Sequence, residues 1–411
     1  MKKNILFLMF FVFISFNLAQ NQNDWKLSGQ VQLRSELDGR DFSNKTYPLT
    51  FSTIRTRIGI EKFVSDKIQF FAQLQDSRAL GQGTPTTFLS NVDLYQGFVK
   101  LINPFDLDLE VQAGRFQMIY GTERFIGASN WSYIARSFDG VRFSIDPQNI
   151  DLDVFAITVN EKQAIISNPA PALYPNPSKD NESFSLYGFY KKSSLTEKSK
   201  LDLFGYYEID RKDIKPDTNT INRFTIGTTY SGNYGNFSTL VEAAYQFGKL
   251  EGLDLAAYLA SIQGSYNFGV TTLTAGADIL SGNNPKEPKK RGAFNVGYGT
   301  NHKFYGYMDY FPANAGGLGL NNFYLKFALN PADSKFNFMI DFHHFMTNQK
   351  SLSNKNILGQ ELDLTVVYRL VPGTSITWGG SLFFPGDLMK AAYAPREDIA
   401  FWSFVMITAN F

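Results

Sequence analysis

Cysteine is absent from the 411 residues of the chain. Its absence excludes disulfide frameworks, thiol nucleophiles and cysteine-ligated metal sites together. No apolar stretch after residue 19 is long enough for a transmembrane helix, so any membrane span has to consist of strands. The formal net charge is only +1. This balance speaks against a nucleic-acid binder, because such proteins carry a concentrated excess of Lys and Arg.

The first residues have the pattern of a secretory signal. Two lysines follow the initial Met, and an almost unbroken apolar run covers residues 5–16, which is too short to span a membrane as a helix. Ala19 is a small residue at the expected cleavage point. The sequence therefore predicts a signal peptide over residues 1–19 and a single exported domain over residues 20–411.

Aromatic residues are abundant, with 39 Phe and 21 Tyr. Apolar and polar residues alternate in segments of roughly 10 to 14 residues, as in tilted transmembrane strands, and we expect about 18 of them. The last segment places Phe401, Val405, Ile407 and Phe411 on one face, a typical C-terminal strand of an outer-membrane barrel. The clearest segments are Thr53–Glu61, Lys67–Gln75, Leu107–Ala113, Ile150–Val159, Lys200–Ile209, Leu253–Tyr266, Phe323–Leu329, Lys335–Phe342, Gln360–Leu370 and Ala400–Phe411.

The connections between these segments alternate in length. Short turns such as 103–106 and 371–374 alternate with long connections such as 79–91, 116–137, 160–182, 211–220 and 282–320. In outer-membrane barrels the short turns are periplasmic and the long loops extracellular. The sequence thus predicts an all-β fold, a transmembrane antiparallel up-and-down β-barrel with an even number of strands and both termini in the periplasm.

Alternation also assigns side chains to the two faces of the barrel wall. Ile54, Ile58 and Ile60 face lipid, so Arg55 and Arg57 face the lumen, because an arginine at mid-membrane on the lipid face costs about 2–4 kcal/mol. A barrel of about 18 strands is wide enough for an aqueous channel unless loops fold into it. The same rule places side chains of both charges in the lumen. They are Arg142, Lys326, Arg369, Glu110, Asp151, Asp153, Asp202, Asp341, Glu361 and Asp363.

The arginines are distributed unevenly along the chain. Nine of the 14 precede residue 150, which places them on one side of the barrel. A planar guanidinium group binds a carboxylate or phosphate through two hydrogen bonds, so a one-sided array suits an anionic solute. An equally weighted alternative is that these arginines pair with Asp76, Glu123 and Asp139 to hold loops in place.

Two blocks of the sequence carry a family resemblance. The first contains Gly114-Arg115, Gly121-x-Glu123-Arg124, Trp131 and Arg136-x-Phe138-Asp139-Gly140, and the second runs from Thr300 to Phe311, followed by residues 341–345. In this order the blocks resemble the alginate export family of outer-membrane channels. The resemblance implies an 18-stranded monomeric barrel that exports an anionic polysaccharide through an electropositive constriction of arginines and inward-folded loops.

The resemblance also implies pore-lining residues. Arg115, Arg124, Arg136 and Arg142 would line the constriction, with Glu123 and Asp139 as their partners. Arg115 lies off the parity of its strand, so it requires a bulge or a position near the rim. The candidate pore-lining and substrate-binding residues are Arg55, Arg57, Arg115, Arg124, Arg136, Arg142, Glu123, Asp139, Asp309 and His302.

The three histidines, His302, His343 and His344, allow a second interpretation. Asp309 and Asp341 lie near them in the sequence, so a His/Asp metal site is conceivable. We favour hydrogen bonds from His302 and His343 that hold a long loop against the barrel wall, because metal motifs show tighter spacing. We therefore expect no metal and no cofactor.

These observations predict a passive outer-membrane channel for an anionic polysaccharide or related oligosaccharide. The acidic lumen residues would oppose a uronate chain, so a general diffusion porin with weak selectivity is the alternative. A scaffold barrel plugged by its loops and a rim-located hydrolase are further alternatives, although no Gly-x-Ser-x-Gly elbow occurs and we expect no enzyme. Expected partners are outer-membrane lipid and the barrel-assembly machinery, the latter through the strand that ends at Phe411.

Overall fold

The computed structural model describes residues 25–81, 91–160, 183–215, 218–311 and 315–411. The predicted signal peptide lies outside the described residues, as does most of the expected connections 79–91 and 160–182.

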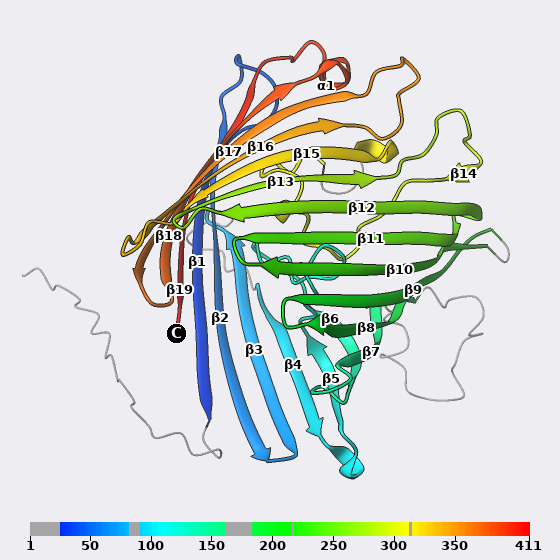
Figure 1. The fold of residues 1–411 in the computed structure, drawn as a ribbon, viewed down its shortest axis with the longest axis vertical. Coiled ribbons are helices and arrows are strands. Elements are labelled where there is room, and N and C mark those ends of the chain that lie inside the picture. Colours follow the sequence, from blue (N-terminus) through cyan, green and yellow to red (C-terminus); the bar gives the residue numbers. More distant parts are fainter. Residues whose placement is uncertain (1–24, 82–90, 161–182, 216–217, 312–314) are drawn as a thin grey trace, which may run out of the picture.

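The described chain forms one sheet of 19 strands, of which the two-residue β14 lies in a loop. The other 18 strands are antiparallel to their neighbours and close into a barrel. Closure occurs between β1 and β19, which pair from Gln30 opposite Asn410 to Gly39 opposite Phe401 (Figure 1). Phe411 extends the seam through two backbone hydrogen bonds with Gly29. The all-β antiparallel barrel expected from the sequence is confirmed.

The strands are β1 (Lys26–Gly39), β2 (Leu49–Ser65), β3 (Ile68–Ala79), β4 (Val92–Ile102), β5 (Leu109–Phe116), β6 (Phe138–Ile145), β7 (Leu152–Asn160), β8 (Phe184–Thr196), β9 (Ser199–Lys215), β10 (Thr218–Tyr234), β11 (Phe237–Leu250), β12 (Leu253–Asn267), β13 (Thr271–Leu280), β14 (Lys290–Arg291), β15 (Leu320–Leu329), β16 (Phe336–Met346), β17 (Ile357–Val371), β18 (Thr374–Pro385) and β19 (Ala400–Asn410). The helices are α1 (Asp387–Tyr393) and the short 3₁₀ turns Pro104–Asp106, Asn301–Lys303 and Ala315–Gly317. No helix among the described residues is long and apolar enough to cross a membrane.

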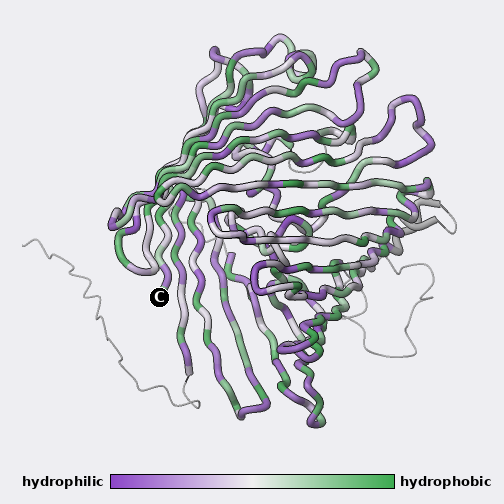
Figure 2. The backbone as a smooth tube through the Cα atoms, viewed as in Figure 1, coloured by the Kyte–Doolittle hydropathy of each residue, from purple (hydrophilic) through white to green (hydrophobic). Residues whose placement is uncertain are grey.

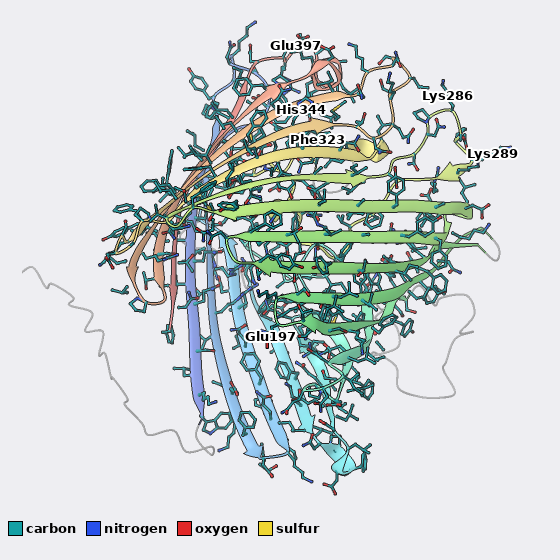
Figure 3. The ribbon with its side chains drawn as sticks, in the orientation of Figure 1. Glu197, Lys286, Lys289, Phe323, His344 and Glu397 are labelled. Carbon is teal, nitrogen blue, oxygen red and sulfur yellow. The ribbon has the colours of Figure 1, made fainter. Side chains whose placement is uncertain are left out.

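Side chains alternate between the two faces of the wall, as the sequence pattern predicts. In β2, Arg55 and Arg57 are buried inside, whereas Ile58 is 54% exposed on the outer face. Figure 2 shows this alternation as hydrophilic and hydrophobic positions that follow one another along the strands. Phe323 of β15, labelled in Figure 3, is one of many large apolar side chains exposed on the outer face. The outer face is thus suited to hydrocarbon and the inner face to polar contacts.

The connections follow the expected alternation with two differences. The expected long connection 211–220 is wrong, because β9 continues to Lys215 and β10 begins at Thr218. The connection between β11 and β12 consists of only Glu251 and Gly252. The β9–β10 and β11–β12 hairpins thus continue as paired strands beyond their apolar residues. Polar residues there are compatible with a solvated strand as well as with a loop. Lys286 and Lys289 lie at the strand ends opposite to the β8–β9 turn that contains Glu197 (Figure 3).

Two long connections pack inside the barrel. We call residues 117–137, between β5 and β6, the first inner loop, and residues 281–311, after β13, the second inner loop. Their buried apolar residues join inward-facing strand residues in one hydrophobic cluster. The loop members of this cluster are Met118, Tyr120, Phe125, Ile126, Phe294, Val296, Tyr305, Met308 and Phe311. These parts of the two loops therefore occupy the barrel interior, whereas the exposed segment 286–290 of the second inner loop lies at the strand ends (Figure 3).

The assignment of the two faces predicts that an arginine destabilises the barrel on the outer face but not on the inner face. Ile58 faces outward in β2, and Gln73, which lies opposite Gly59 in β3, faces the lumen. We expect Ile58→Arg to lower the free energy of unfolding by about 2–4 kcal/mol and Gln73→Arg to leave it nearly unchanged. Urea unfolding in lipid vesicles measures both, and equal losses would contradict the assignment.

Candidate functional site in the barrel interior

Arg124 of the first inner loop is the most heavily bonded side chain of the interior. Its guanidinium group pairs with Glu242 of β11 at 2.6 Å and with Asp278 of β13 at 3.0 Å. It also donates to the Tyr305 hydroxyl of the second inner loop at 3.1 Å, and its Cζ lies 4.0 Å from the ring centroid of Phe304. The side chain is 2% exposed. Arg124 thus fixes both inner loops to the wall.

The electrostatic environment keeps Arg124 charged. Burial acts to lower its pKa, but the negative charges of Asp278 and Glu242, together with Tyr305, raise the pKa well above the ordinary value of an arginine. A buried charge of this kind persists because charged partners and hydrogen bonds replace the lost water. Two carboxylates of the wall thus share one loop arginine, and the three groups together carry a formal charge of −1.

Arg55 and Arg57 bind the first inner loop without any carboxylate. Arg55 donates to the backbone carbonyl oxygens of Ser132 at 2.8 Å and Asn130 at 3.1 Å. Arg57 donates to the side-chain oxygen of Asn130 in the same loop at 3.2 Å and to Gln75 of β3 at 2.7 Å, and its Cζ lies 3.8 Å from the ring centroid of Tyr95. The Nη2 atom of Arg57 is buried and has no hydrogen-bond partner. These two arginines present positive charge that amide oxygens and one aromatic ring only partly compensate.

Arg136, at the end of the first inner loop, also binds oxygen atoms of the backbone and no carboxylate. Its Nη1 atom donates to the carbonyl oxygens of Gly127, Tyr298 and Gly299. Burial lowers the pKa of Arg136, and Tyr298 and Tyr95 offset that effect only in part. Among the described residues, Arg55, Arg57 and Arg136 form no ion pair, so we call them the uncompensated arginines.

Glu123 connects the two inner loops. Its carboxylate accepts hydrogen bonds from Thr300 at 3.0 Å and from Lys303 at 3.4 Å. The backbone of the two loops pairs at the same place, where Gly127 donates to Tyr298 and Thr300 donates to Glu123. Glu123 was expected beside the arginines, and the structure places it beside a lysine of the second inner loop.

His302 belongs to an aromatic stack. Its ring lies 4.0 Å from the Trp131 ring at an interplanar angle of 4°, and its Nδ1 atom is 2.9 Å from Asp309. His343 of β16 is 2.9 Å from Asn322. Both histidines are hydrogen-bonded, but the expectation that these bonds hold a loop against the wall is wrong. His302 and Asp309 belong to the same loop, and His343 and Asn322 lie on the neighbouring strands β16 and β15. No group of three His, Cys, Asp or Glu side chains in the described part of the chain can hold a metal ion.

Arg142 and Arg115 lie on opposite faces of the wall. Arg142 of β6 points inward, donates to Gln112 and lies 3.7 Å from Asp153. Arg115 pairs with Asp139 at 2.7 Å on the face opposite to the buried side chains of neighbouring Phe116 and Phe138. The pairing of β5 with β4 and β6 shows no register shift, which excludes a β-bulge at Arg115. Of the two positions expected for Arg115, the one near the rim therefore remains. Arg115 and Asp139 therefore do not line the interior.

The acidic residues of the wall are largely paired. Glu208 pairs with Arg223 at 2.7 Å, and Asp341 pairs with Lys326 at 2.8 Å. Asp151 lies in the β6–β7 turn rather than on a strand and pairs with Lys192 at 3.0 Å. The carboxylates that the sequence places in the lumen are thus mostly neutralised by neighbouring cations.

A polar cleft of about 630 Å³ lies beside the first inner loop. Ile119 and Gly121 of that loop form one side and the β6–β7 turn the other. Lys192, Lys200 and Asp202 also line it. Because the β6–β7 turn is one of the short turns, this cleft lies on the side of the barrel predicted to be periplasmic.

Sequence reasoning missed the partners of the arginines. Glu242 and Asp278 are separated from Arg124 by 118 and 154 residues, so no local spacing marks them. Glu242 carries one usable signal, because it alternates with the outward-facing Val241 and Tyr245, so strand parity places its carboxylate in the lumen. The apolar residues of the first inner loop, Met118 and Phe125 among them, are a second signal, because solvated loops rarely carry so many.

The Arg124 contacts predict a large destabilisation on its removal. We expect Arg124→Met to lower the free energy of unfolding by about 3–5 kcal/mol, because Glu242 and Asp278 remain buried without a cation. Arg115→Met at the rim should cost about 0–1 kcal/mol, as for other exposed pairs. Chemical unfolding of the refolded barrels measures both. Equal costs would contradict the role assigned to Arg124.

Comparison with known proteins agrees with this geometry. No curated protein sequence is similar enough to count as a relative. Among solved structures, the BenF-like porin from Pseudomonas fluorescens Pf-5 is 13% identical, with a TM-score of 0.61 over 94% of this chain and 98% of that one. OccK2 (OpdF) from Pseudomonas aeruginosa, solved in complex with glucuronate, is 12% identical, with a TM-score of 0.60 over 94% and 96%. OpdK from the same organism, solved with vanillate, is 10% identical, with a TM-score of 0.60 over 94% and 98%.

These similarities place the chain among outer-membrane β-barrel porins in fold, and the families and structures it matches are transport channels rather than enzymes. The profile of the alginate export family matches residues 26–401, which is most of the chain. The protein is therefore an outer-membrane β-barrel channel and belongs to the alginate export family.

Proposed function

We propose that the channel conducts small carboxylated solutes, with uronates and short oligouronates as the substrate class. The observation that carries this proposal is the group of uncompensated arginines, Arg55, Arg57 and Arg136. Their guanidinium groups bind only amide oxygens and aromatic rings, and one N–H group of Arg57 is unpaired. A carboxylate is the ligand that such a group binds most strongly, because it can accept two parallel charge-assisted hydrogen bonds.

The inner loops limit the size of the solute. Arg124, Glu123 and the hydrophobic cluster hold both loops within the barrel. A long polyuronate would have to displace these contacts, whereas a monosaccharide or short oligosaccharide requires only local movement. OccK2 and OpdK, with the same fold, bind glucuronate and vanillate, which are both small carboxylates. These comparisons support the proposed substrate class.

The acidic residues of the wall are compatible with an anionic solute. Glu208, Glu242 and Asp341 are paired with arginine or lysine at 2.6–2.8 Å, so they add little net negative potential. Conductance would come from diffusion, with selectivity set by the uncompensated charges at the constriction. We expect the channel to work as a monomer and to reach the membrane through recognition of the strand that ends at Phe411.

The dense packing of the interior favours one second candidate, a scaffold barrel that its own loops plug. Arg55, Phe116, Met118 and Tyr305 are nearly inaccessible to solvent. A plugged barrel and a channel differ in ion conductance, because only the channel has a continuous aqueous path.

Planar bilayer recordings under a KCl gradient test the proposal. We expect the wild-type reversal potential to show anion preference and oligouronates, but not neutral oligosaccharides, to block the current. Substitution of Arg55 and Arg57 by Gln should lower the anion-to-cation permeability ratio about threefold or more, because the local potential of a pore depends on its unpaired charges. Arg78→Gln, on the outer face beside Asp76, is the matched control and should change nothing.

Unchanged selectivity of the Arg55→Gln, Arg57→Gln variant would remove the arginines from the mechanism. Conductance with weak selectivity and no uronate block would indicate a general diffusion porin. A wild-type barrel without conductance would establish the plugged scaffold.

A further inference from the structure

The polar cleft beside the first inner loop is lined by none of the uncompensated arginines. Its sides are formed by that loop, by the β6–β7 turn and by strands β8 and β9. The volume of about 630 Å³ is within the range of roughly 300–1,000 Å³ that is typical of small-molecule sites. The cleft is therefore large enough for a ligand, at a position that the proposed function does not use.

Strand pairing gathers four polar side chains of β8 and β9 on the inner face of the wall. Lys192 lies opposite Asp202, and Ser194 lies opposite Lys200. Tyr190, two positions before Lys192, is buried inside the barrel, so the alternation of the strand places Lys192 and Ser194 on the same inner face. All four polar residues line the cleft. Two ammonium groups, one carboxylate and one hydroxyl group thus lie in one part of it.

Several charged atoms of the cleft have no hydrogen-bond partner in the described part of the chain. Asp202 accepts a hydrogen bond of 2.6 Å from the Tyr190 hydroxyl through Oδ2 alone. Asp151 of the β6–β7 turn accepts one of 3.0 Å from Lys192 through Oδ1 alone. Lys200 donates no hydrogen bond and forms no ion pair among the described residues. One oxygen of each carboxylate and the three N–H groups of Lys200 therefore remain for a ligand.

The first inner loop closes the inner side of the cleft with its backbone. A Cβ atom added to Gly121 would lie 2.7 Å from the Tyr190 hydroxyl and 3.9 Å from Asp202 Oδ2. The φ of Gly121 is 53°, in the left-handed region that favours glycine. The glycine thus allows the loop to pass directly against the Tyr190–Asp202 pair.

Two isoleucines give the cleft apolar surfaces. Ile119 comes from the first inner loop and is 49% exposed, and Ile150 comes from the β6–β7 turn and is 42% exposed. The loop and the turn form different sides of the cleft, so an apolar side chain lies on each of them. The polar groups of β8 and β9 line the space beside them. This combination suits a ligand with both apolar and polar surfaces.

We propose that this cleft binds an acidic sugar, a uronate or a uronate disaccharide. A pyranose ring has apolar faces, which suit Ile119 and Ile150, and a rim of hydroxyl groups, which donate to the free oxygens of Asp151 and Asp202. The ammonium group of Lys200 binds the carboxylate of the sugar through charge-assisted hydrogen bonds. A phosphate group fits less well, because two nearby carboxylates repel a doubly charged anion.

The inference rests on the proposed function for the class of solute and adds a second site for it. The cleft lies on the side predicted to be periplasmic, and the first inner loop, which Arg55 and Arg57 bind, forms one of its sides. A sugar held there lies next to the loop of the proposed constriction. The site raises the local concentration of uronates on that side of the barrel.

Protection of a single cysteine from alkylation tests the proposal, because the natural chain contains no cysteine. Ser194→Cys places a thiol at an exposed position of the cleft with little change in side-chain volume. Iodoacetamide, which is neutral, labels this thiol in the refolded barrel. We expect digalacturonate to slow the labelling hyperbolically, to about a tenth of the rate at roughly ten times its Kd. Maltose, a neutral disaccharide, should leave the rate unchanged.

Further variants in the Ser194→Cys background identify the charge that binds the sugar. Lys200→Gln should weaken the protection at least about fivefold, the effect of one exposed charge pair. Lys200→Arg keeps the charge and should keep the protection. Lys198→Gln, on the same hairpin but outside the cleft, is the matched control and should also keep it. A barrel with Asn236→Cys alone, in the β10–β11 turn, should be labelled equally fast with and without the sugar.

Three results would overturn the proposal. They are labelling of Ser194→Cys that digalacturonate does not slow, undiminished protection in the Lys200→Gln variant, and equal protection by maltose or inorganic phosphate. Failure of the proposed function is seen elsewhere, as absence of anion preference in the bilayer recordings. Protection that persists in the Arg55→Gln, Arg57→Gln background is the expected result for a separate site, and its loss there would contradict one.

Discussion

The buried ion pairs of Arg124 are the interaction on which the interior depends. One guanidinium group from the first inner loop pairs with Glu242 and Asp278 on two separate strands and also contacts Tyr305 of the second inner loop. Each partner would be costly to bury alone, because a charge without water needs a counter-charge. The ion pairs of Arg124 therefore couple the inner loops to the wall. If Arg124 is displaced, the two carboxylates are left buried without a counter-charge, and the reverse also holds.

This constraint explains why charges of both signs occupy the lumen. Most wall carboxylates neutralise a nearby cation, as Glu208 does for Arg223 and Asp341 for Lys326. Positive charge that has no carboxylate partner gathers around Arg55, Arg57 and Arg136. The proposed solute selectivity and the position of the loops thus depend on different arginines.

The alternation of apolar and polar residues was sufficient to predict the barrel wall but not the packing of its interior. This alternation depends only on residues that are adjacent in sequence, so it predicted the strands, their two faces and the inward position of Arg55 and Arg57. The expected loop 211–220 was wrong because ladder pairing continues outside the apolar band. Contacts such as Arg124 with Glu242 depend on loop trajectories across the barrel, and no spacing encodes them. The family motif marked Arg124 and Glu123, while their partners came only from the structure.

The central claim is that the inner loops are part of the folded interior rather than mobile covers. Hydrogen–deuterium exchange of the refolded barrel tests it without altering the chain. The account predicts that amides of residues 120–128 and 294–305, which pair with each other and with the wall, exchange nearly as slowly as those of β11 and β12. Exchange of these amides as rapid as that of the exposed connection 350–355 would contradict it.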